Sequence, residues 1–402
     1  MLTIQAIRDA RARIRDSIYL SPFVRSETFS QLTGNSIHFK LDNLQMTGAF
    51  KERGALNKIL LLNDDERRRG VIAASAGNHA QAVAYHSTKR GIKAEICMPL
   101  TTPITKVSAT RGYGAEVVLF GANYDEACQE AVRRCQQRGL TFIHPFDDEA
   151  VIAGQGTIGL EMLEVTQDLN AVIIPVGGGG LIAGIGCAVK ETHPQIKVIG
   201  VQTSKLPSMK AAVEKHKLVT LPPNKTIADG IAVRRAGDIT FPLVEKYVDD
   251  IVTVDEEEIA NAILVMLEKE KTLTEGAGAV AVAAVLNRKV PFTGKKLGVL
   301  VSGGNIDVTL LSRIIERGLV KDGRLLRIRI HLPDHPGALV RLSSVIADHK
   351  ANIIETRHDR AYYGVVLGDT VIDITMETRG PEHIAEIEDA LDAAGYPHER
   401  VQ

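Results

Sequence analysis

The chain has 402 residues, of which 45% are hydrophobic and 24% are charged, and its formal net charge is -1. A chain of this length usually forms two or three domains, and this composition excludes disordered and collagen-like proteins. The near-neutral charge argues against nucleic acid or an anionic membrane as the main partner.

The four cysteines include no C-x-x-C pair, so we expect neither a zinc site nor a disulfide framework, and a cytoplasmic location. Residues Met1–Tyr19 mix arginine with aspartate, which is typical of an amphipathic surface helix and not of a signal peptide. Residues Ala171–Val189 carry no charge, but Pro175 and six glycines interrupt them. We therefore predict a strand, a glycine loop and a helix there instead of a membrane span.

Between Asn35 and Val320, short apolar runs alternate with helical patterns, which predicts an α/β fold with parallel sheets flanked by helices. The predicted strands are Ile37–Leu41, Val71–Ala74, Ala94–Met98, Glu116–Phe120, Thr141–Ile143, Ala171–Val176, Lys197–Val201, Ile251–Val254 and Leu297–Val301. The predicted helices are Lys51–Leu62, His79–Arg90, Ala122–Arg138, Thr157–Thr166, Ile182–Thr192, Glu256–Glu270, Gly276–Leu286 and Asp307–Arg317.

After residues 321–326 the pattern changes to strand, helix, strand, strand, helix, strand, which predicts a separate ferredoxin-like module. Its predicted elements are strand Leu326–Leu332, helix Pro336–His349, strands Asn352–His358 and Val365–Met376 around Tyr362–Gly364, helix Pro381–Ala394 and strand His398–Val401.

Four segments place unusual residues where a strand or loop meets a helix, and the first is TGAFKERG, residues 47–54. In a dry pocket the amine of Lys51, between Phe50 and small residues, would become nucleophilic. The plain alternative is a solvated lysine at a helix start.

The second segment is SAGNHAQ, residues 75–81, which directly follows a predicted strand. Its backbone amides would cradle a carboxylate, and a simple helix cap is the alternative.

The third segment is a glycine loop between a predicted strand and helix, formed by Gly177, Gly178, Gly179, Gly180 and Leu181. Such a loop lets several N–H groups reach a phosphate. With Ala183 it also satisfies a loose dinucleotide pattern, but the next strand ends at Gln202 and not at the acid that a ribose requires. A nicotinamide-dependent dehydrogenase is therefore the weaker alternative.

The fourth segment, SGGN, puts Ser302 at the carboxyl end of a strand, where open α/β sheets bind ligands and where helix caps also occur.

Together the four segments resemble the fold type II pyridoxal-phosphate enzymes, specifically the serine/threonine dehydratases, also called threonine ammonia-lyases. The resemblance implies a two-lobed catalytic domain over residues 1–320, with a smaller lobe at about 52–145 inserted in the larger one. It implies that Lys51 is the Schiff-base lysine, Phe50 the ring-stacking partner and Asn78 a donor to the phenolic oxygen of pyridoxal phosphate. The glycine loop would bind the phosphate, and Ser302 the pyridine nitrogen. The substrate carboxylate would be held by the segment Ser75, Ala76, Gly77, Asn78 and His79.

The implied reaction is dehydration of L-threonine to 2-oxobutanoate and ammonia, and of L-serine to pyruvate, with Lys51, Ser75 and Asn78 as the catalytic residues. Serine racemase and 3-hydroxyaspartate dehydratase are the alternatives within the fold. Racemases that resemble this chain carry a serine where Ala76 stands, so we expect dehydration to dominate. The acids that bind a divalent metal in some relatives are replaced by Gln202 and Ser208, so no divalent metal is expected, and a monovalent cation on backbone carbonyls stays an alternative.

Residues 326–402 resemble an ACT domain, a regulatory amino-acid-binding module, through the stretches LPDHPGAL and ANII. The resemblance implies an effector site with isoleucine or valine as ligand, and a role in isoleucine biosynthesis. A dimerising lid without ligand is the alternative. We also expect a homo-oligomer, either dimer or tetramer. The expected effector-binding residues are Gly337, Ala338, Leu339, Asn352 and Ile353.

Overall fold

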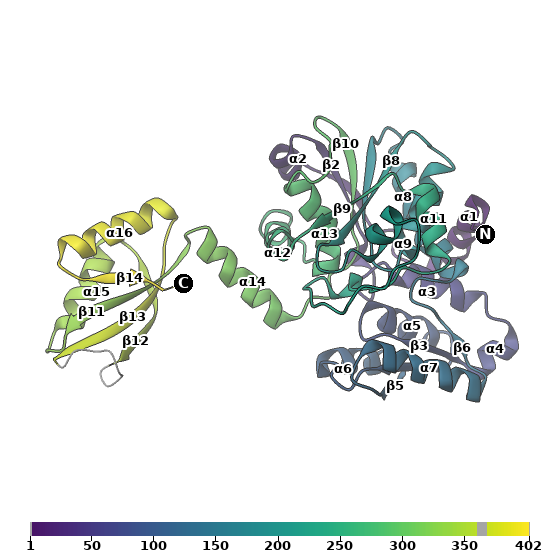
Figure 1. Cartoon of the computed structure of the whole chain (residues 1–402), viewed down its shortest axis with the longest axis horizontal. Coiled ribbons are helices and arrows are strands. Elements are labelled where there is room, and N and C mark those ends of the chain that lie inside the picture. Colours follow the sequence, from purple (N-terminus) through teal and green to yellow (C-terminus); the bar gives the residue numbers. More distant parts are fainter. Residues whose placement is uncertain (1, 360–367, 402) are drawn as a thin grey trace. The chain divides into compact units, whose positions relative to one another are not determined.

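The computed structural model describes residues 2–359 and 368–401, which form two compact units, Met1–Ile306 and Asp307–Gln402. The first unit holds two parallel sheets, and the second holds one antiparallel sheet (Figure 1). The structure therefore confirms the α/β class expected for the larger part of the chain. No helix among the described residues is long and apolar enough to cross a membrane.

The larger lobe of the first unit is built on a six-stranded sheet. Only its edge strand β1 runs antiparallel to its neighbour. The strand order is β1 (Phe23–Ser26), β2 (Ser36–Leu41), β10 (Lys296–Val301), β7 (Ala171–Pro175), β8 (Lys197–Thr203) and β9 (Asp250–Val254). Figure 1 shows helices on both faces. One group comprises α1 (Ile4–Ile14), α8 (Glu149–Val165), α9 (Gly180–Lys190) and α11 (Thr240–Tyr247). The other comprises α2 (Glu27–Thr33), α12 (Glu256–Val265), which continues as a π-helical turn η4 (Met266–Glu270), and α13 (Gly276–Leu286).

The smaller lobe is built on a four-stranded parallel sheet whose residues all lie within the segment 52–145. The strand order is β5 (Glu116–Leu119), β4 (Ala94–Met98), β3 (Val71–Ala74) and β6 (Thr141–Phe142). The helices of this part of the chain are α3 (Lys51–Leu60), α4 (Asp64–Arg69), α5 (Asn78–Thr88), α6 (Ile104–Gly112) and α7 (Tyr124–Arg138). Helix α3 contacts both α5 of the smaller lobe and α8 of the larger one.

The nine strands predicted for the catalytic part are all present, with ends that differ by at most two residues. The short edge strand β1 and five helices were not predicted: α2, α4, α6, α10 (Ser208–Glu214) and α11. Helix α8 differs most, because it begins at Glu149 instead of the predicted Thr157. The sequence pattern did not predict its first half, because two glycines there lower the helix propensity.

Those two glycines are required by packing. A Cβ on Gly154 would lie 2.5 Å from the Arg53 carbonyl oxygen, and one on Gly156 would lie 2.8 Å from the Gly184 carbonyl oxygen. Helix α8 therefore approaches α3 and α9 at backbone distance. The close packing outweighs the helix propensity that glycine sacrifices.

The second unit begins with α14 (Val308–Lys321), so the two units divide between Ile306 and Asp307, earlier than the end of the catalytic domain expected at 320. The structure confirms the βαββαβ order that follows. Its sheet order is β12 (Asn352–Asp359), β13 (Asp369–Glu377), β11 (Leu325–Pro333) and β14 (His398–Arg400), with helices α15 (Ala338–Asp348) and α16 (Pro381–Ala393). The expected turn Tyr362–Gly364 lies outside the described residues.

A fully buried guanidinium joins three elements of the first unit. Arg53 of α3 donates through Nε to Asp42 Oδ2 at 2.7 Å and through Nη1 to Glu161 Oε1 at 2.5 Å. Asp42 begins the short turn η2 (Asp42–Leu44) after β2, and Glu161 lies on α8. The Lys40 amine also contacts Glu161, at 2.7 Å. Burial opposes the charge of Arg53, but the two carboxylates raise its pKa and keep it protonated.

Replacing Arg53 by methionine is expected to lower the free energy of unfolding by about 3–5 kcal/mol, because the two buried carboxylates of Asp42 and Glu161 would then share the single charge of Lys40. Urea denaturation measures this loss. Arg68→Met is the matched control, since Arg68 pairs with Asp65 at the surface and its side chain is 75% exposed. That variant is expected to lose less than about 1 kcal/mol. Equal losses in the two variants would contradict the importance of the buried network.

Candidate active site

Lys51 is the first residue of α3, and the loop before it is tied to the large-lobe sheet. The Phe50 N–H donates to the Ser302 carbonyl oxygen at 3.0 Å. The Lys51 amine donates to the Pro145 carbonyl oxygen at 2.7 Å and lies 5.2 Å from the centre of the Phe50 ring. Burial lowers the pKa of Lys51 to about 8, while Glu275 acts in the opposite direction. At neutral pH this amine is therefore neutral, and nucleophilic, far more often than an ordinary lysine.

The expected carboxylate-binding turn, Ser75–His79, connects β3 to α5. The Ser75 hydroxyl accepts a hydrogen bond from the Gly77 N–H at 3.2 Å and so stabilises the turn. A Cβ on Gly77 would meet nothing within 4 Å, so the turn faces open space. Its other N–H groups at the helix start donate to no described residue; they belong to Ala76, Asn78 and His79. Unpaired N–H groups at a helix N-terminus are suited to bind a carboxylate.

The glycine loop lies between β7 and α9, against Phe146. A Cβ on Gly180 would lie 2.6 Å from the Phe146 carbonyl oxygen, and one on Gly178 would lie 2.4 Å from its ring. Phe146 directly follows Pro145, which accepts the hydrogen bond of Lys51, so the loop and the amine share one wall. The loop N–H groups donate to no described residue, from Gly177 through Gly178, Gly179 and Gly180 to Leu181.

Ser302 follows β10 and is 2% exposed. Its carbonyl oxygen accepts from the Phe50 N–H, whereas its hydroxyl has no hydrogen-bond partner among the residues that the structure describes. A buried hydroxyl of this kind is available to a ligand.

A chain of side-chain hydrogen bonds connects the first, second and fourth segments. Asn305 Nδ2 donates to the Thr47 carbonyl oxygen at 2.6 Å and to Asn78 Oδ1 at 2.8 Å. Asn78 Nδ2 donates in turn to Glu275 Oε1 at 2.6 Å. Gly48 has a φ of 74°, and a Cβ there would lie 2.5 Å from Asn305 Oδ1. The glycine of the first motif is therefore needed because the asparagine of the fourth packs against it.

Glu275 was not found by the sequence analysis. It is 5% exposed, and burial together with the Asp229 carboxylate raises its pKa to about 7. Its only sequence signal is that it immediately precedes an uncharged helix of small residues, α13. Asn305, Pro145 and Phe146 were missed as well, because their roles arise from contacts between segments far apart in the chain.

Two histidines beside Lys51 are neutral at neutral pH. His79 Nε2 donates to the Ile143 carbonyl oxygen at 2.8 Å, and its Nδ1 is buried without a described partner. Burial and the nearby Lys51 lower the pKa of His79 to about 3, and burial also lowers the pKa of His144. Neither imidazole supplies a charged acid to the site.

The expected effector residues lie on α15 and β12 of the second unit. Gly337 precedes α15 with a φ of 85°, a conformation that favours glycine. Ala338 is buried, Leu339 is exposed and Ile353 is half-buried. Asn352 Nδ2 donates to Glu377 Oε2 at 2.9 Å, so this amide already has a partner within the domain.

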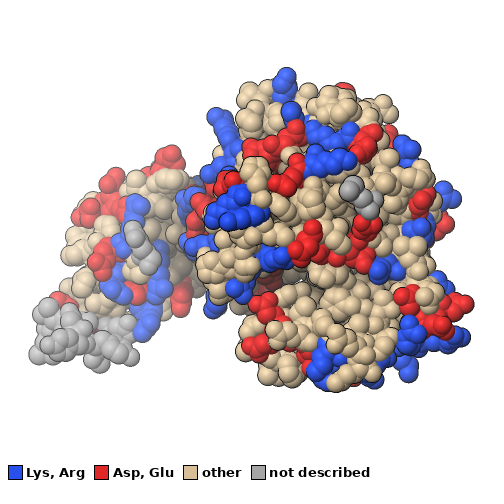
Figure 2. All heavy atoms as spheres, turned by 45° about the vertical axis from the view of Figure 1, so that its right-hand side comes forward, with Lys and Arg blue, Asp and Glu red and all other residues tan. Residues whose placement is uncertain are grey.

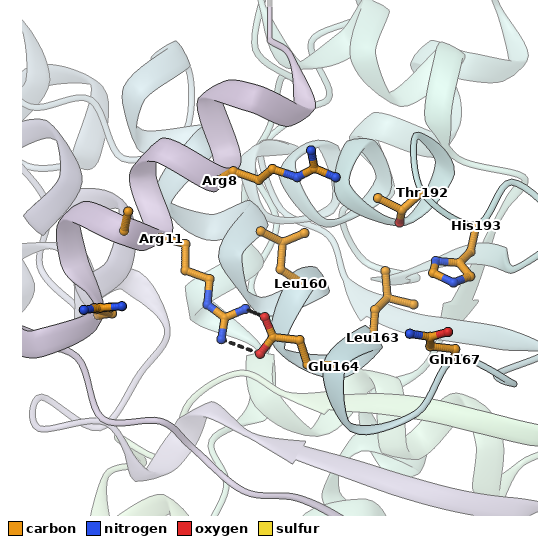
Figure 3. Close-up of a pocket in the computed structure, with 10 residues that line it drawn as sticks. Arg8, Arg11, Leu160, Leu163, Glu164, Gln167, Thr192 and His193 are labelled. Carbon is orange, nitrogen blue, oxygen red and sulfur yellow. Dashed lines mark hydrogen bonds and ion pairs between the residues drawn. The ribbon is translucent and has the colours of Figure 1, made fainter.

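A separate surface hollow of about 600 Å³ contains none of the residues expected at the active site (Figure 3). It lies between α1, α8 and the end of α9, where Arg11 forms an ion pair with Glu164. Its lining residues are Arg8, Arg11, Ala12, Arg15, Leu160, Leu163, Glu164, Gln167, Thr192 and His193. Elsewhere on the visible face of the first unit, acidic and basic side chains are intermixed (Figure 2).

The side chains present fit pyridoxal phosphate. A half-buried amine of lowered pKa suits the aldehyde, the unpaired N–H groups at the start of α9 suit the phosphate, and the unpartnered Ser302 hydroxyl suits the ring nitrogen. Lys51 follows the turn after β2, the glycine loop follows β7 and Ser302 follows β10, so these groups come from the carboxyl ends of neighbouring strands, the side of α/β sheets that binds ligands.

Comparison with known proteins leads to the same cofactor. Residues 14–303 match the family model described as pyridoxal-phosphate dependent enzyme, and residues 326–395 match that of the ACT domain. An L-threonine ammonia-lyase of Thermotoga maritima is 48% identical over 98% of both chains. A threonine deaminase structure from Solanum lycopersicum is 37% identical with a TM-score of 0.75, covering 79% of this chain and 90% of that one. The structure of maize serine racemase is 34% identical with the same TM-score, covering 80% of this chain and 98% of that one. The chain belongs to the family of pyridoxal-phosphate dependent enzymes and carries a C-terminal ACT domain.

Proposed function

We propose that this chain is an L-threonine ammonia-lyase, which converts L-threonine to 2-oxobutanoate and ammonia and acts on L-serine to give pyruvate. The observation that carries the proposal is the half-buried Lys51 amine of lowered pKa, which shares a wall with the glycine loop. The relative from Thermotoga maritima, similar over nearly the whole chain, supports this choice of substrate.

Lys51 would hold the cofactor through Nζ, and the N–H groups of Gly177–Leu181 would bind its phosphate. Asn78 would donate to the phenolic oxygen, and Ser302 would hydrogen-bond the ring nitrogen. Pyridoxal phosphate supplies an electron sink for the pair of electrons left when the α-proton of the substrate departs.

The N–H groups of Ala76, Asn78 and His79 hold the substrate carboxylate and so fix the direction of the α-carbon–hydrogen bond. Once the substrate amine has taken its place on the cofactor, the freed and neutral Lys51 Nζ would take the α-proton as general base. The β-hydroxyl would then leave as water together with one proton, so that the proton taken up by Lys51 is balanced. Hydrolysis of the resulting enamine consumes one water and releases ammonia and the 2-oxo acid.

Two side chains favour elimination over the rival reactions. Ala76 has no group that could return a proton to the opposite face of the α-carbon, as racemisation requires. Ser302 is neutral and would not hold a positive charge on the ring nitrogen, so the cofactor would supply a weaker electron sink, which favours elimination over transamination. Both arguments disfavour racemase and transaminase activity.

The main test is covalent trapping. Reduction of the reconstituted enzyme with borohydride is expected to abolish activity and to place the cofactor mass on Lys51, as peptide mass spectrometry would show. Lys51→Ala is expected to release no 2-oxobutanoate from threonine. Lys58→Ala is the matched control, because Lys58 lies two turns further along α3 and pairs with Asp148. An adduct on another lysine, or none, would refute the assignment.

A second test uses the pH dependence of cofactor attachment. Because only the neutral amine is nucleophilic and the pKa of Lys51 is lowered to about 8, the rate of reconstitution should rise through this pH and level off near about pH 9. Stopped-flow absorbance of the apoenzyme mixed with pyridoxal phosphate measures it. N-acetyl-lysine is the control, whose amine should continue to accelerate until about pH 11. A parallel rise for both would show that burial does not activate Lys51.

The ACT domain is proposed to bind isoleucine or valine as a feedback effector, with the N–H groups at Gly337–Leu339 holding the ligand carboxylate. The chain is further proposed to assemble as a homodimer or homotetramer. Four exposed apolar side chains of the catalytic unit support assembly: Tyr19, Leu20, Leu44 and Met46.

Isothermal titration of the full chain with isoleucine and valine is expected to give a saturable signal, and the bound effector should change substrate affinity by about 1–3 kcal/mol. Asn352→Ala should weaken effector binding. Asn224→Ala, which changes an exposed asparagine of the catalytic unit, should leave it unchanged. Silence for both amino acids would leave the domain with a purely structural role.

A further inference from the structure

The side-chain amide of Asn78 is held at both ends by groups that fix its orientation. Its Oδ1 accepts from Asn305 Nδ2, and its Nδ2 donates to Glu275 Oε1. The Asn305 atom that contacts Asn78 must be the amide nitrogen, because the same atom also contacts the Thr47 carbonyl oxygen, which can only accept a hydrogen bond. The network therefore has one direction, from the Asn305 donor to the Glu275 acceptor.

An asparagine amide can rotate by half a turn and exchange its donor with its acceptor. Such a rotation of Asn78 would bring Oδ1 against the Glu275 carboxylate and Nδ2 against the Asn305 nitrogen. An ionised carboxylate accepts only, so it excludes the rotated state, whereas a protonated carboxyl group could donate to Oδ1. The amide nitrogen carries two hydrogens, and Glu275 uses one of them, which leaves the other for a ligand.

We propose that Glu275 is a positioning residue of the active site, whose ionised carboxylate fixes the Asn78 amide so that its second N–H is available to the cofactor's phenolic oxygen. This inference rests on the proposed function and extends it by one residue. The Glu275 carboxylate also lies close to the turn after Ser302, since a Cβ on Gly303 would be 2.4 Å from Glu275 Oε1. The backbone of the two segments is joined by the Glu275 N–H, which donates to the Gly303 carbonyl oxygen at 3.0 Å.

Three charged groups from other elements act on Glu275. Burial and Asp229, at the start of the short helical turn η3 (Asp229–Ile231), raise its pKa to about 7, while Lys106 of α6 lowers it. Lys51 of α3 is electrostatically coupled to the same carboxylate. Lys106 and Asp229 form an ion pair at 2.6 Å. The orienting charge is consequently gained as the pH rises through about 7, and activity should follow it.

The test compares the holoenzyme of the wild type with Glu275→Gln, which preserves shape and removes the charge. We expect kcat for threonine to fall by about 10–100-fold with little change in KM, as for other outer partners that orient a ligand-binding group. The visible absorption band of the bound cofactor should shift, and the cofactor should dissociate more readily. The loss of activity near pH 7 that Glu275 causes should disappear, while the dependence on the neutral Lys51 amine near pH 8 remains. Unchanged kcat, spectrum and pH profile in a folded variant would overturn the proposal.

A double-mutant cycle with Asn78→Ala separates positioning from a general structural role. If Glu275 acts through Asn78, adding Glu275→Gln to Asn78→Ala should cause no further loss of kcat or of cofactor affinity. A full additional loss would show that Glu275 acts by another route. Thermal unfolding of each variant confirms that the fold is retained.

Asp229→Asn provides an independent control outside the catalytic machinery. Asp229 raises the pKa of Glu275, so its removal should move the acidic limb to lower pH and leave the maximal rate unchanged. A limb that stays in place would contradict the role of Glu275. If the wild type releases no 2-oxo acid from any hydroxyl amino acid, the proposed function fails, and the cofactor-affinity cycle still decides whether Glu275 orients Asn78.

Discussion

The catalytic unit depends on a guanidinium that water does not reach. Arg53 lies two residues after Lys51, and its side chain is shared between Asp42, which follows β2, and Glu161, on α8. Removing the charges of Arg53, Lys40 and the two carboxylates from water is costly. Their paired geometry and the hydrogen bond that Arg53 donates to Thr157 offset that cost. These contacts fix where α3 begins relative to the large sheet. They therefore also fix the position of the Lys51 amine, which belongs to the first residue of α3. Buried charges here specify position more than they add stability.

The sequence was sufficient for elements whose own residues determine them. The fully buried strands β3, β4 and β7 and the small-residue helix α13 were predicted with nearly correct ends, because a mainly apolar run between turns can form little else in a layered fold. The first half of α8 was not predicted, because Gly154 and Gly156 lower its helix propensity and are required by its close packing against α3 and α9. The edge strand β1 has four residues with only its ends buried, and it is defined by its pairing with β2.

The residues of the active site fall into the same two groups, those that the sequence predicts and those that only the fold reveals. Lys51, the turn at Ser75–His79, the glycine loop and Ser302 could be named because their residue types are unusual at a strand-to-helix junction and together resemble one family. Glu275 could not be named in that way, since a single acid before a helix is common and its importance comes from Asn78, 197 residues away in the chain. Likewise, nothing near Pro145 indicates that its carbonyl oxygen accepts from the Lys51 amine. Motifs identify the groups that touch the ligand, and only the fold shows which groups hold them.

The contact between Gly48 and Asn305 has an evolutionary consequence. The two positions are 257 residues apart, yet a methyl group at the first would overlap the amide of the second. Neither can change freely: a larger residue at position 48 is tolerable only if position 305 becomes smaller, and the bridge to Asn78 would then be lost. Homologous chains should therefore vary at these two positions together or not at all.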